Sequence, residues 1–167
     1  YNDIYACIHF AAYKSVGESV ENPSKYYKNN IGSTEVLLKC LNKNKFKNLI
    51  FSSSCTVYGM PDKLPVNENA PFKKAESPYG ETKQECEILI SKNSCNSVSL
   101  RYFNPIGSHG SGLIGDCSSD KASNLVPIVT EVACGIRDKL IVNGNDYNTH
   151  DGTCVRAVSY THLTLPT

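Results

Sequence analysis

Short apolar segments alternate with helical patterns along this chain, and this alternation constrains the fold more than any other feature. The apolar segments cover residues 4–12, 48–53 and 98–103 and are continuously apolar. Such strands are typical of a parallel sheet that helices cover on both faces. We therefore expect an α/β fold built on a doubly wound parallel sheet, with ligands beyond the carboxyl ends of its strands.

Two expected helices begin with a proline that follows a capping residue. Pro23 follows Asn22, and Pro78 follows Ser77. Proline is favoured in the first turn because its nitrogen needs no hydrogen-bond partner there. The first helix should run for about five turns, since apolar residues recur on one face. They are Tyr27, Ile31, Leu38 and Leu41. The second should end near residue 92.

The chain after residue 103 has weaker patterns. Residues 104–122 are rich in Gly, Ser, His and Asp without a period, which is typical of a long functional loop. A third helix is expected over residues 123–137, and a short strand over residues 139–142. No internal repeat is present.

Charge and composition exclude several classes of protein. Lysine and arginine total 17 and aspartate and glutamate 16, so the formal net charge is +1. That balance argues against binding to nucleic acid or to an anionic membrane surface. No apolar run approaches the roughly 20 residues of a membrane-spanning helix, and the first residues lack a signal peptide's basic flank. We expect a cytoplasmic protein with neither kind of partner.

Eight cysteines raise the question of disulfides or a metal site. They form no C-x-x-C pair, and the four histidines are scattered at positions 9, 109, 150 and 162. Structural zinc sites usually bring their ligands in close pairs, so we expect no metal. We interpret the cysteines as reduced side chains that pack like small apolar residues.

Tyr79 and Lys83 lie four residues apart at the start of the second expected helix, which puts both side chains on one face. A free tyrosine has a pKa near 10, so a role as base near neutral pH needs a shift of roughly three units, or about 4 kcal/mol. We expect the Lys83 ammonium to supply part of that shift by favouring the phenolate. The alternative is a half-exposed tyrosine beside a solvated lysine.

Three serines, residues 52–54, stand where the second apolar segment ends. This is the edge at which open α/β sheets bind ligands. Ser54 is a candidate to hydrogen-bond a substrate oxygen and to pass a proton towards Tyr79. An ordinary helix cap or serine turn is the alternative.

Together these features resemble the extended short-chain dehydrogenase/reductase family, and in detail its UDP-glucose (UDP-galactose) 4-epimerases. The matching segments follow the family's order within residues 4–156: IHFAAYKSVGESVENPSKYYKNN, NLIFSSSCTVYG, SPYGETK, LRYFNPIGSH, SNLVP and GNDYNTHDGTCVR. The resemblance implies a Rossmann-like fold and an NAD-dependent isomerase of galactose metabolism. In that family the sugar is oxidised at C4, the 4-keto sugar rotates, and the same carbon is reduced again on its other face.

The resemblance also implies residue roles. Tyr79 is the base, Lys83 lowers its pKa and holds the nicotinamide ribose, and Ser54 orients the sugar's 4-oxygen; the cationic nicotinamide ring would lower the Tyr79 pKa further. Contacts to NAD are implied for Ser54, Tyr79 and Lys83, and also for Phe10, Ala11, Ala12, Tyr13, Lys14, Asn29, Tyr102 and Phe103. Contacts to the UDP-sugar are implied for Ser54, Tyr79, Asn104, Asn124, Leu125 and Arg156.

Ordinary roles stay open for four of these residues. Phe10 and Leu125 suit a hydrophobic core, Asn29 suits a solvated helix face, and Arg156 suits an exposed surface.

The chain also departs from the family pattern. It has no G-x-x-G-x-x-G loop, whose amides normally hold the pyrophosphate. We expect that the N-terminal βαβαβ half and the C-terminal substrate region of the family are missing. Residues 1–156 are then a partial NAD-binding domain with substrate-loop segments, and residues 157–167 a non-native tail. Asn143 stands where the family often has an aromatic residue.

These expectations lead to one main function and two alternatives. The full-length parent, which we expect to be a homodimer, would interconvert UDP-galactose and UDP-glucose, while the fragment alone would be inactive. Another nucleotide-sugar epimerase or dehydratase is the first alternative, although a dehydratase needs acid–base carboxylates that residues 54–56 lack. A non-catalytic, truncated scaffold is the second. Acceptance of N-acetylated UDP-sugars stays open.

Overall fold

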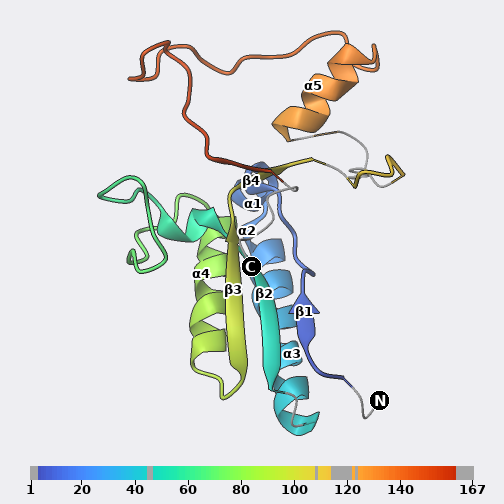
Figure 1. Ribbon diagram of the computed structural model, residues 1–167. Coiled ribbons are helices and arrows are strands. Elements are labelled where there is room, and N and C mark those ends of the chain that lie inside the picture. Colours follow the sequence, from blue (N-terminus) through green and yellow to red (C-terminus); the bar gives the residue numbers. More distant parts are fainter. Residues whose placement is uncertain (1–3, 45–46, 108, 114–121, 123, 161–167) are drawn as a thin grey trace. The chain divides into compact units, whose positions relative to one another are not determined.

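The computed structural model describes residues 4–44, 47–107, 109–113, 122 and 124–160. The chain forms two compact units (Figure 1), a first unit, Tyr1–Tyr102, and a second unit, Phe103–Thr167. None of the helices in the described ranges is long and apolar enough to cross a membrane.

A three-stranded parallel sheet forms the centre of the first unit. Its strands are β1 (Cys7–His9), β2 (Asn48–Ser54) and β3 (Asn96–Tyr102), in the order β1-β2-β3. The register aligns Ile8 with Ile50 and Ile50 with Val98. The expected parallel sheet is confirmed. Strand β1 is shorter than the predicted residues 4–12, because the chain leaves the sheet after His9 and its backbone finds side-chain partners instead.

The helices of the first unit follow the predicted caps. The side chain of Asn22 accepts a hydrogen bond from the Lys25 amide, and that of Ser77 accepts one from the Gly80 amide. The helical elements are α1 (Val16–Glu21), α2 (Pro23–Tyr26), the π-helical turn η1 (Tyr27–Ile31), α3 (Gly32–Asn44), the 3-10 turn η2 (Cys55–Tyr58) and α4 (Pro78–Ser91). The predicted long helix is therefore present with a π turn inside it, and α1 was not predicted.

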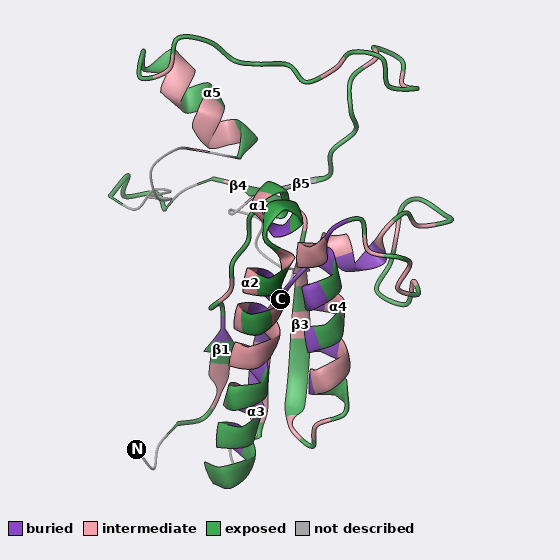
Figure 2. Ribbon diagram, turned by 180° about the vertical axis from the view of Figure 1, so that it is seen from behind, coloured by how far each residue is buried: buried purple, intermediate pink, exposed green. Residues whose placement is uncertain are grey.

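Helices α3 and α4 pack on one face of the sheet, as Figure 2 shows from behind. Their buried residues meet the inward side chains of β2 in a single core. The core residues are Leu38, Leu41, Leu49, Phe51, Cys86 and Ile90. Because strand residues alternate between faces, Leu49 and Phe51 share this side of the sheet, which fixes the register of β2 against the helices.

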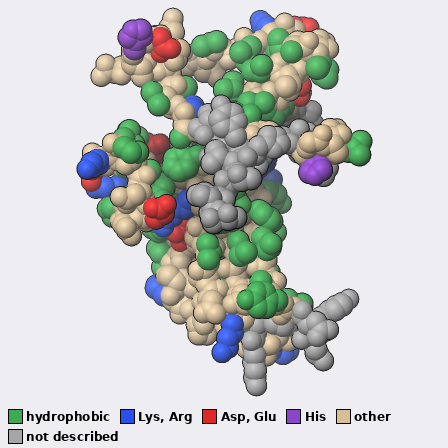
Figure 3. Space-filling model, viewed as in Figure 1, with side chains coloured by type: hydrophobic (Ala, Val, Ile, Leu, Met, Phe, Trp, Pro, Cys, Tyr) green, Lys and Arg blue, Asp and Glu red, His purple; other side chains and the backbone are tan. Residues whose placement is uncertain are grey.

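The other face of the sheet carries no helix among the described residues, which differs from the expected cover on both faces. Ile8 and Val98 are each 56% exposed there, and hydrophobic side chains show at this surface in Figure 3. The strand order explains the difference. Both crossovers advance in one direction across the sheet, and right-handed crossovers of that kind place their helices on the same side.

The second unit contains α5 (Leu125–Ala133) and a two-stranded parallel sheet of β4 (Asn104–Ile106) and β5 (Val158–Tyr160). Helix α5 is shorter than the predicted residues 123–137. Gly135 has φ 71° just after it, and the Ile136 amide bonds back to the Glu131 carbonyl, which closes the helix. β5 lies within the residues that the sequence assigned to a tail.

The predicted strand over residues 139–142 is wrong. These residues have no regular structure, and Leu140, Ile141 and Val142 are exposed. A strand requires a neighbouring strand for its backbone hydrogen bonds, and none of the described strands pairs with this segment. β4 likewise replaces the start of the loop expected over residues 104–122.

Candidate active site

Tyr79 and Lys83 lie on one face of the first turns of α4, as their spacing predicted. Lys83 is only 4% exposed, and its ammonium lies 5.8 Å from the centre of the Tyr79 ring. The same ammonium donates a 2.7 Å hydrogen bond to the carbonyl oxygen of Ser52, in β2. The lysine is therefore anchored to the carboxyl end of the central strand, beside the tyrosine.

Ser54 is the last residue of β2, and its side chain interacts with Tyr79. Its Oγ accepts hydrogen bonds from the Thr56 amide (3.3 Å) and from Thr56 Oγ1 (3.0 Å). Two accepted bonds leave the Ser54 hydroxyl proton free to donate, and a hydrogen bond joins Ser54 to the Tyr79 side chain. Ser54 is thus the cap of η2, which confirms that interpretation, and its contact with a substrate oxygen stays a prediction.

Burial changes the pKa values of both Tyr79 and Lys83. Burial raises the pKa of Tyr79, and the Ser54 hydrogen bond opposes that rise only in part. Burial also lowers the pKa of Lys83, while Cys86 and Glu87 raise it. Lys83 is not among the groups that shift the Tyr79 pKa in this chain, and its expected effect on the phenol stays a prediction for the complex with the cofactor. The Lys83 ammonium is engaged with a backbone carbonyl, and desolvation of the phenolate is the larger effect.

Tyr102 lies at the same edge of the sheet. The register pairs it with Ser54, so the ends of β2 and β3 bring these two residues side by side. Tyr102 is exposed, as a residue that contacts a ligand must be. The structure thus gathers four predicted residues, Ser54, Tyr79, Lys83 and Tyr102, at the carboxyl edge where α/β sheets bind ligands.

The predicted cofactor loop follows β1 directly. Phe10 is 63% exposed, which excludes the core role that the sequence left open for it. Ala11, Tyr13 and Lys14 are also exposed, while Ala12 is half-buried. The backbone of Tyr13 is held at both its amide and its carbonyl by the side chain of Asn30, in η1.

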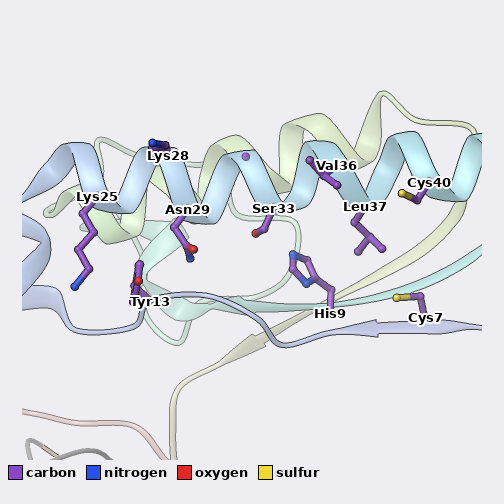
Figure 4. A pocket seen from close by; sticks show the side chains of 11 residues that line it. Cys7, His9, Tyr13, Lys25, Lys28, Asn29, Ser33, Val36, Leu37 and Cys40 are labelled. Carbon is purple, nitrogen blue, oxygen red and sulfur yellow. The ribbon is translucent and has the colours of Figure 1, made fainter.

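A groove of about 700 Å³ runs between β1 with this loop and the helices α2, η1 and α3 (Figure 4). Tyr13 and Asn29, both predicted cofactor contacts, line it together with Lys25, Lys28 and Ser33. The ammonium of Lys25 lies 4.3 Å from the centre of the Tyr13 ring. Cations, an aromatic ring and amide donors form a donor set that fits an anionic, ring-bearing cofactor.

The four predicted UDP-sugar residues belong to the second unit. Asn104 lies in β4, where its Nδ2 donates a 2.7 Å hydrogen bond to the Ala157 carbonyl. Asn124 precedes α5, and Leu125 is its first residue, exposed rather than in a core. Arg156 is exposed. The predicted contact Phe103 is the first residue of this unit.

Sequence analysis missed a buried polar network beside the site. It joins Asn30 and Thr34, on the helical segment η1–α3, to Thr82 and Cys86 on α4 and to His9 on β1. A signal was present: Asn30 lies three residues after Tyr27 and four before Thr34, on the stripe that faces the core. A buried asparagine at such a position needs hydrogen-bond partners.

A second missed group joins α4 to β3. Arg101 makes a two-pronged ion pair with the buried Glu87, with its closest contact at 2.8 Å. Its guanidinium also donates to the Tyr58 hydroxyl and to the Glu68 carbonyl, each at 3.1 Å. Glu87 in turn accepts a hydrogen bond from Ser53. This pair fixes α4, and with it Tyr79 and Lys83, against the end of the sheet.

Comparisons with known proteins agree with these features. The model of the NAD dependent epimerase/dehydratase family matches residues 2–156. The UDP-glucose 4-epimerase of Dictyostelium discoideum is 49% identical over 159 residues, which are 92% of this chain and 46% of the relative. That of Bos taurus is 47% identical over 163 residues, 95% of this chain and 46% of the relative. The chain therefore spans about half the length of the curated relatives it matches.

Solved structures show the same likeness. The UDP-glucose 4-epimerase of Bifidobacterium longum, in complex with NAD+ and UDP, has a TM-score of 0.89 at 45% identity. The match covers 95% of this chain and 49% of that one. The enzyme from Stenotrophomonas maltophila, with bound NAD and formylated UDP-arabinopyranose, has a TM-score of 0.87 at 43% identity, over 94% of this chain and 48% of that one.

Proposed function

Because this chain belongs to the NAD dependent epimerase/dehydratase family, we propose that it is part of an NAD-dependent UDP-glucose 4-epimerase. The complete protein would interconvert UDP-galactose and UDP-glucose, a reaction of galactose metabolism. The observation that carries this proposal is the grouping of Ser54, Tyr79 and Lys83 at the carboxyl edge of the parallel sheet. The 46% share of the relatives' length supports assigning the activity to the complete protein rather than to these residues alone.

The donor set of the groove fits NAD. Tyr13, Asn29 and the other residues of the loop after β1 would hold the cofactor, with Lys83 and Tyr102 beside its reactive end. Lys28 offers positive charge to its pyrophosphate, whereas the Lys25 ammonium is paired with Glu18. When bound, NAD+ supplies a hydride acceptor for the carbon that bears the sugar's 4-hydroxyl, and the reduced form returns that hydride.

Tyr79 would take the proton of the sugar's 4-hydroxyl. Its pKa lies above the ordinary value of a tyrosine in this chain, because burial disfavours the phenolate. A group that holds its proton so firmly is a poor base at neutral pH. The proposal therefore requires that Tyr79 becomes an effective base only when a further positive charge lies close to it, as it would in the complex with the oxidised cofactor.

Ser54 and Lys83 would prepare Tyr79 for this step. The Ser54 hydroxyl, whose oxygen already accepts two hydrogen bonds from Thr56, has its proton left to donate to the phenolate. The Lys83 ammonium uses one of its three N–H groups on the Ser52 carbonyl, so the other two stay available for the cofactor's ribose. Both groups are held by backbone contacts and need little rearrangement when the ligands bind.

We further propose that the complete protein is a cytoplasmic homodimer. All seven cysteines among the described residues are free, which suits a reducing compartment. Val16 and Val20 are exposed on α1, which suits a helical interface with a second copy.

The test is the reaction itself. The complete natural protein, incubated with UDP-galactose and NAD+, should form UDP-glucose until both sugars reach equilibrium. Failure to form UDP-glucose would contradict the proposal. The 167-residue chain alone should bind NAD+ only weakly in isothermal titration, because it lacks the glycine-rich loop; micromolar binding would contradict that part.

A further inference from the structure

We propose that Asn30 is a positioning residue, which ties the loop after β1 to the helical turn that carries Tyr79. The inference rests on the proposed function and adds a residue outside the predicted site. It is drawn from a continuous path of three hydrogen bonds, from Tyr13 to Asn30, from Asn30 to Thr82 and from Thr82 to Tyr79.

The Asn30 side chain uses its whole hydrogen-bonding capacity. Its Oδ1 accepts from the Tyr13 amide at 2.9 Å and from Asn29 Nδ2 at 3.1 Å. Its Nδ2 donates to the Tyr13 carbonyl at 3.1 Å and to Thr82 Oγ1 at 3.2 Å. An amide side chain offers two lone pairs and two N–H groups, so all four are occupied. Asn30 is 2% exposed, and water cannot replace these partners.

At one end of the path, Asn30 fixes the backbone of the predicted cofactor loop. It binds both the amide and the carbonyl of Tyr13, as a neighbouring strand would, although β1 has already ended at His9. The Tyr13 ring stays exposed and lines the groove. The backbone position of Tyr13, and with it the shape of the groove, depends on one amide side chain.

At the other end, Thr82 fixes the turn of α4 that carries the proposed base. Thr82 is fully buried, and its Oγ1 accepts from Asn30 and donates to the Tyr79 carbonyl at 2.8 Å. The Tyr79 amide donates to Ser19 Oγ at 3.2 Å, so side chains hold both polar groups of this peptide backbone. Loss of the Thr82 hydroxyl would remove one hydrogen bond from the Tyr79 carbonyl and one from the Asn30 amide, and with them the link between the two.

The π turn η1 is what places Asn30 between the two ends. Such a turn inserts an extra residue into a helix and is frequent at functional sites. The Asn30 carbonyl here accepts from Thr34 Oγ1 at 2.9 Å and from Ser33 Oγ at 3.2 Å. The Asn30 side chain itself points to the other partners and lies between the loop and α4.

The experiment uses the complete natural protein and three threonine variants. Thr82→Val keeps the side chain's shape but removes the hydroxyl, whereas Thr82→Ser keeps the hydroxyl. Thr34→Val is the matched control: Thr34 is equally buried, but its hydroxyl contacts His9, Cys86 and the backbone carbonyl of Asn30, and not the Asn30 side chain. Each variant is measured for thermal unfolding, for NAD+ dissociation constant and for kcat at saturating cofactor.

We expect Thr82→Val to lower kcat by about tenfold, because small displacements of a catalytic group reduce the rate steeply. Its NAD+ dissociation constant should rise by less than about threefold, since the hold on Tyr13 persists. Thr82→Ser and Thr34→Val should keep kcat within about threefold, although Thr34→Val unfolds at a lower temperature. Asn30→Ala, which breaks both ends, should weaken NAD+ binding and lower kcat, each by at least about tenfold.

Wild-type kcat in Thr82→Val, or an equal loss in Thr82→Ser or Thr34→Val, would overturn the proposal. If Asn30→Ala does not fold, the difference in kcat between Thr82→Val and Thr82→Ser tests the proposal instead. If the wild type binds NAD+ but does not turn over UDP-galactose, the proposed function fails, and the NAD+ affinity of Asn30→Ala still decides the role of Asn30. A wild type that binds no NAD+ contradicts both.

Discussion

The two units differ in how their apolar residues are used. In the first unit, Leu49, Phe51 and Cys86 are almost fully buried between β2 and the helices α3 and α4. In the second unit, α5 is strongly apolar but has no buried residue, and Leu125 is 63% exposed. The difference teaches that an apolar helix buries its side chains only where a sheet lies against it. The proposed base, Tyr79, is on α4, which is one of the helices packed in this way. Five measurements test this comparison.

The largest effect should come from the proposed base. Tyr79→Phe in the complete protein removes the phenolic oxygen, and we expect kcat for UDP-galactose to fall by about 1,000-fold while bound NAD stays the same. Tyr147→Phe, at an exposed tyrosine of the second unit, is the control and should keep kcat near that of the wild type. Turnover retained in Tyr79→Phe would remove this residue from its proposed role.

The contrast in packing predicts the next effect. Phe51→Ala opens a cavity in the core of the first unit, and the free energy of unfolding should fall by about 3–5 kcal/mol. Leu125→Ala removes a similar apolar side chain from the surface of the second unit and should change it by less than about 0.5 kcal/mol. Denaturant unfolding of both variants measures the difference. Equal losses in the free energy of unfolding would contradict the claim that, among the described residues, only the first unit has a packed core.

One ion pair in each unit extends the comparison of buried and exposed side chains. Glu87–Arg101 in the first unit and Glu131–Arg137 in the second both measure 2.8 Å, but the Glu87 side chain is 8% exposed and that of Glu131 26%. Glu87→Gln should lower the free energy of unfolding by about 2 kcal/mol, because it leaves a largely buried guanidinium without its charge partner.

Glu131→Gln is the matched control and should change the free energy of unfolding by less than about 1 kcal/mol, since water screens the more exposed pair. Urea unfolding at low ionic strength measures both. A larger loss for Glu131→Gln than for Glu87→Gln would show that burial does not rank these pairs.

The smallest effect concerns pH. Burial, and to a lesser extent the charge of Lys83, lower the pKa of His9 below 6.5. Above that pH the imidazole is neutral in both states; below it, the unfolded chain takes up the proton first, so stability should fall between pH 6.5 and the lower pKa of the folded state. His9→Gln should flatten this part of the profile, and His109→Gln, at an exposed histidine, should not. An unchanged slope in His9→Gln contradicts the assignment.

The sequence predicted the first unit better than the second for a physical reason. Caps at Asn22 and Ser77, and apolar spacing over β2 and α4, are local signals, and packing on the sheet reinforces them. The strand expected over residues 139–142 failed because no described strand pairs with it. The described helices lie on one face of the sheet because strand order, which spacing does not reveal, decides where crossover helices lie.

The candidate site shows the same limit. Spacing alone placed Tyr79 and Lys83 on one face of α4, and the end of β2 placed Ser54 nearby. Burial raises the Tyr79 pKa and the Lys83 ammonium is anchored to a backbone carbonyl, and the sequence states neither the burial nor the anchor. Asn30 was missed because its partners, Tyr13 and Thr82, are far away in the chain.

The most direct test of the central claim is the pKa of Tyr79, followed by ultraviolet difference absorbance of the complete protein against Tyr79→Phe. Without cofactor, the account predicts that Tyr79 titrates above the ordinary value of about 10 for a tyrosine. With bound NAD+, the positive charge of the nicotinamide ring should lower the Tyr79 pKa, so that more phenolate is present when the sugar binds. A Tyr79 pKa that does not fall when NAD+ is bound would contradict the proposed role of Tyr79.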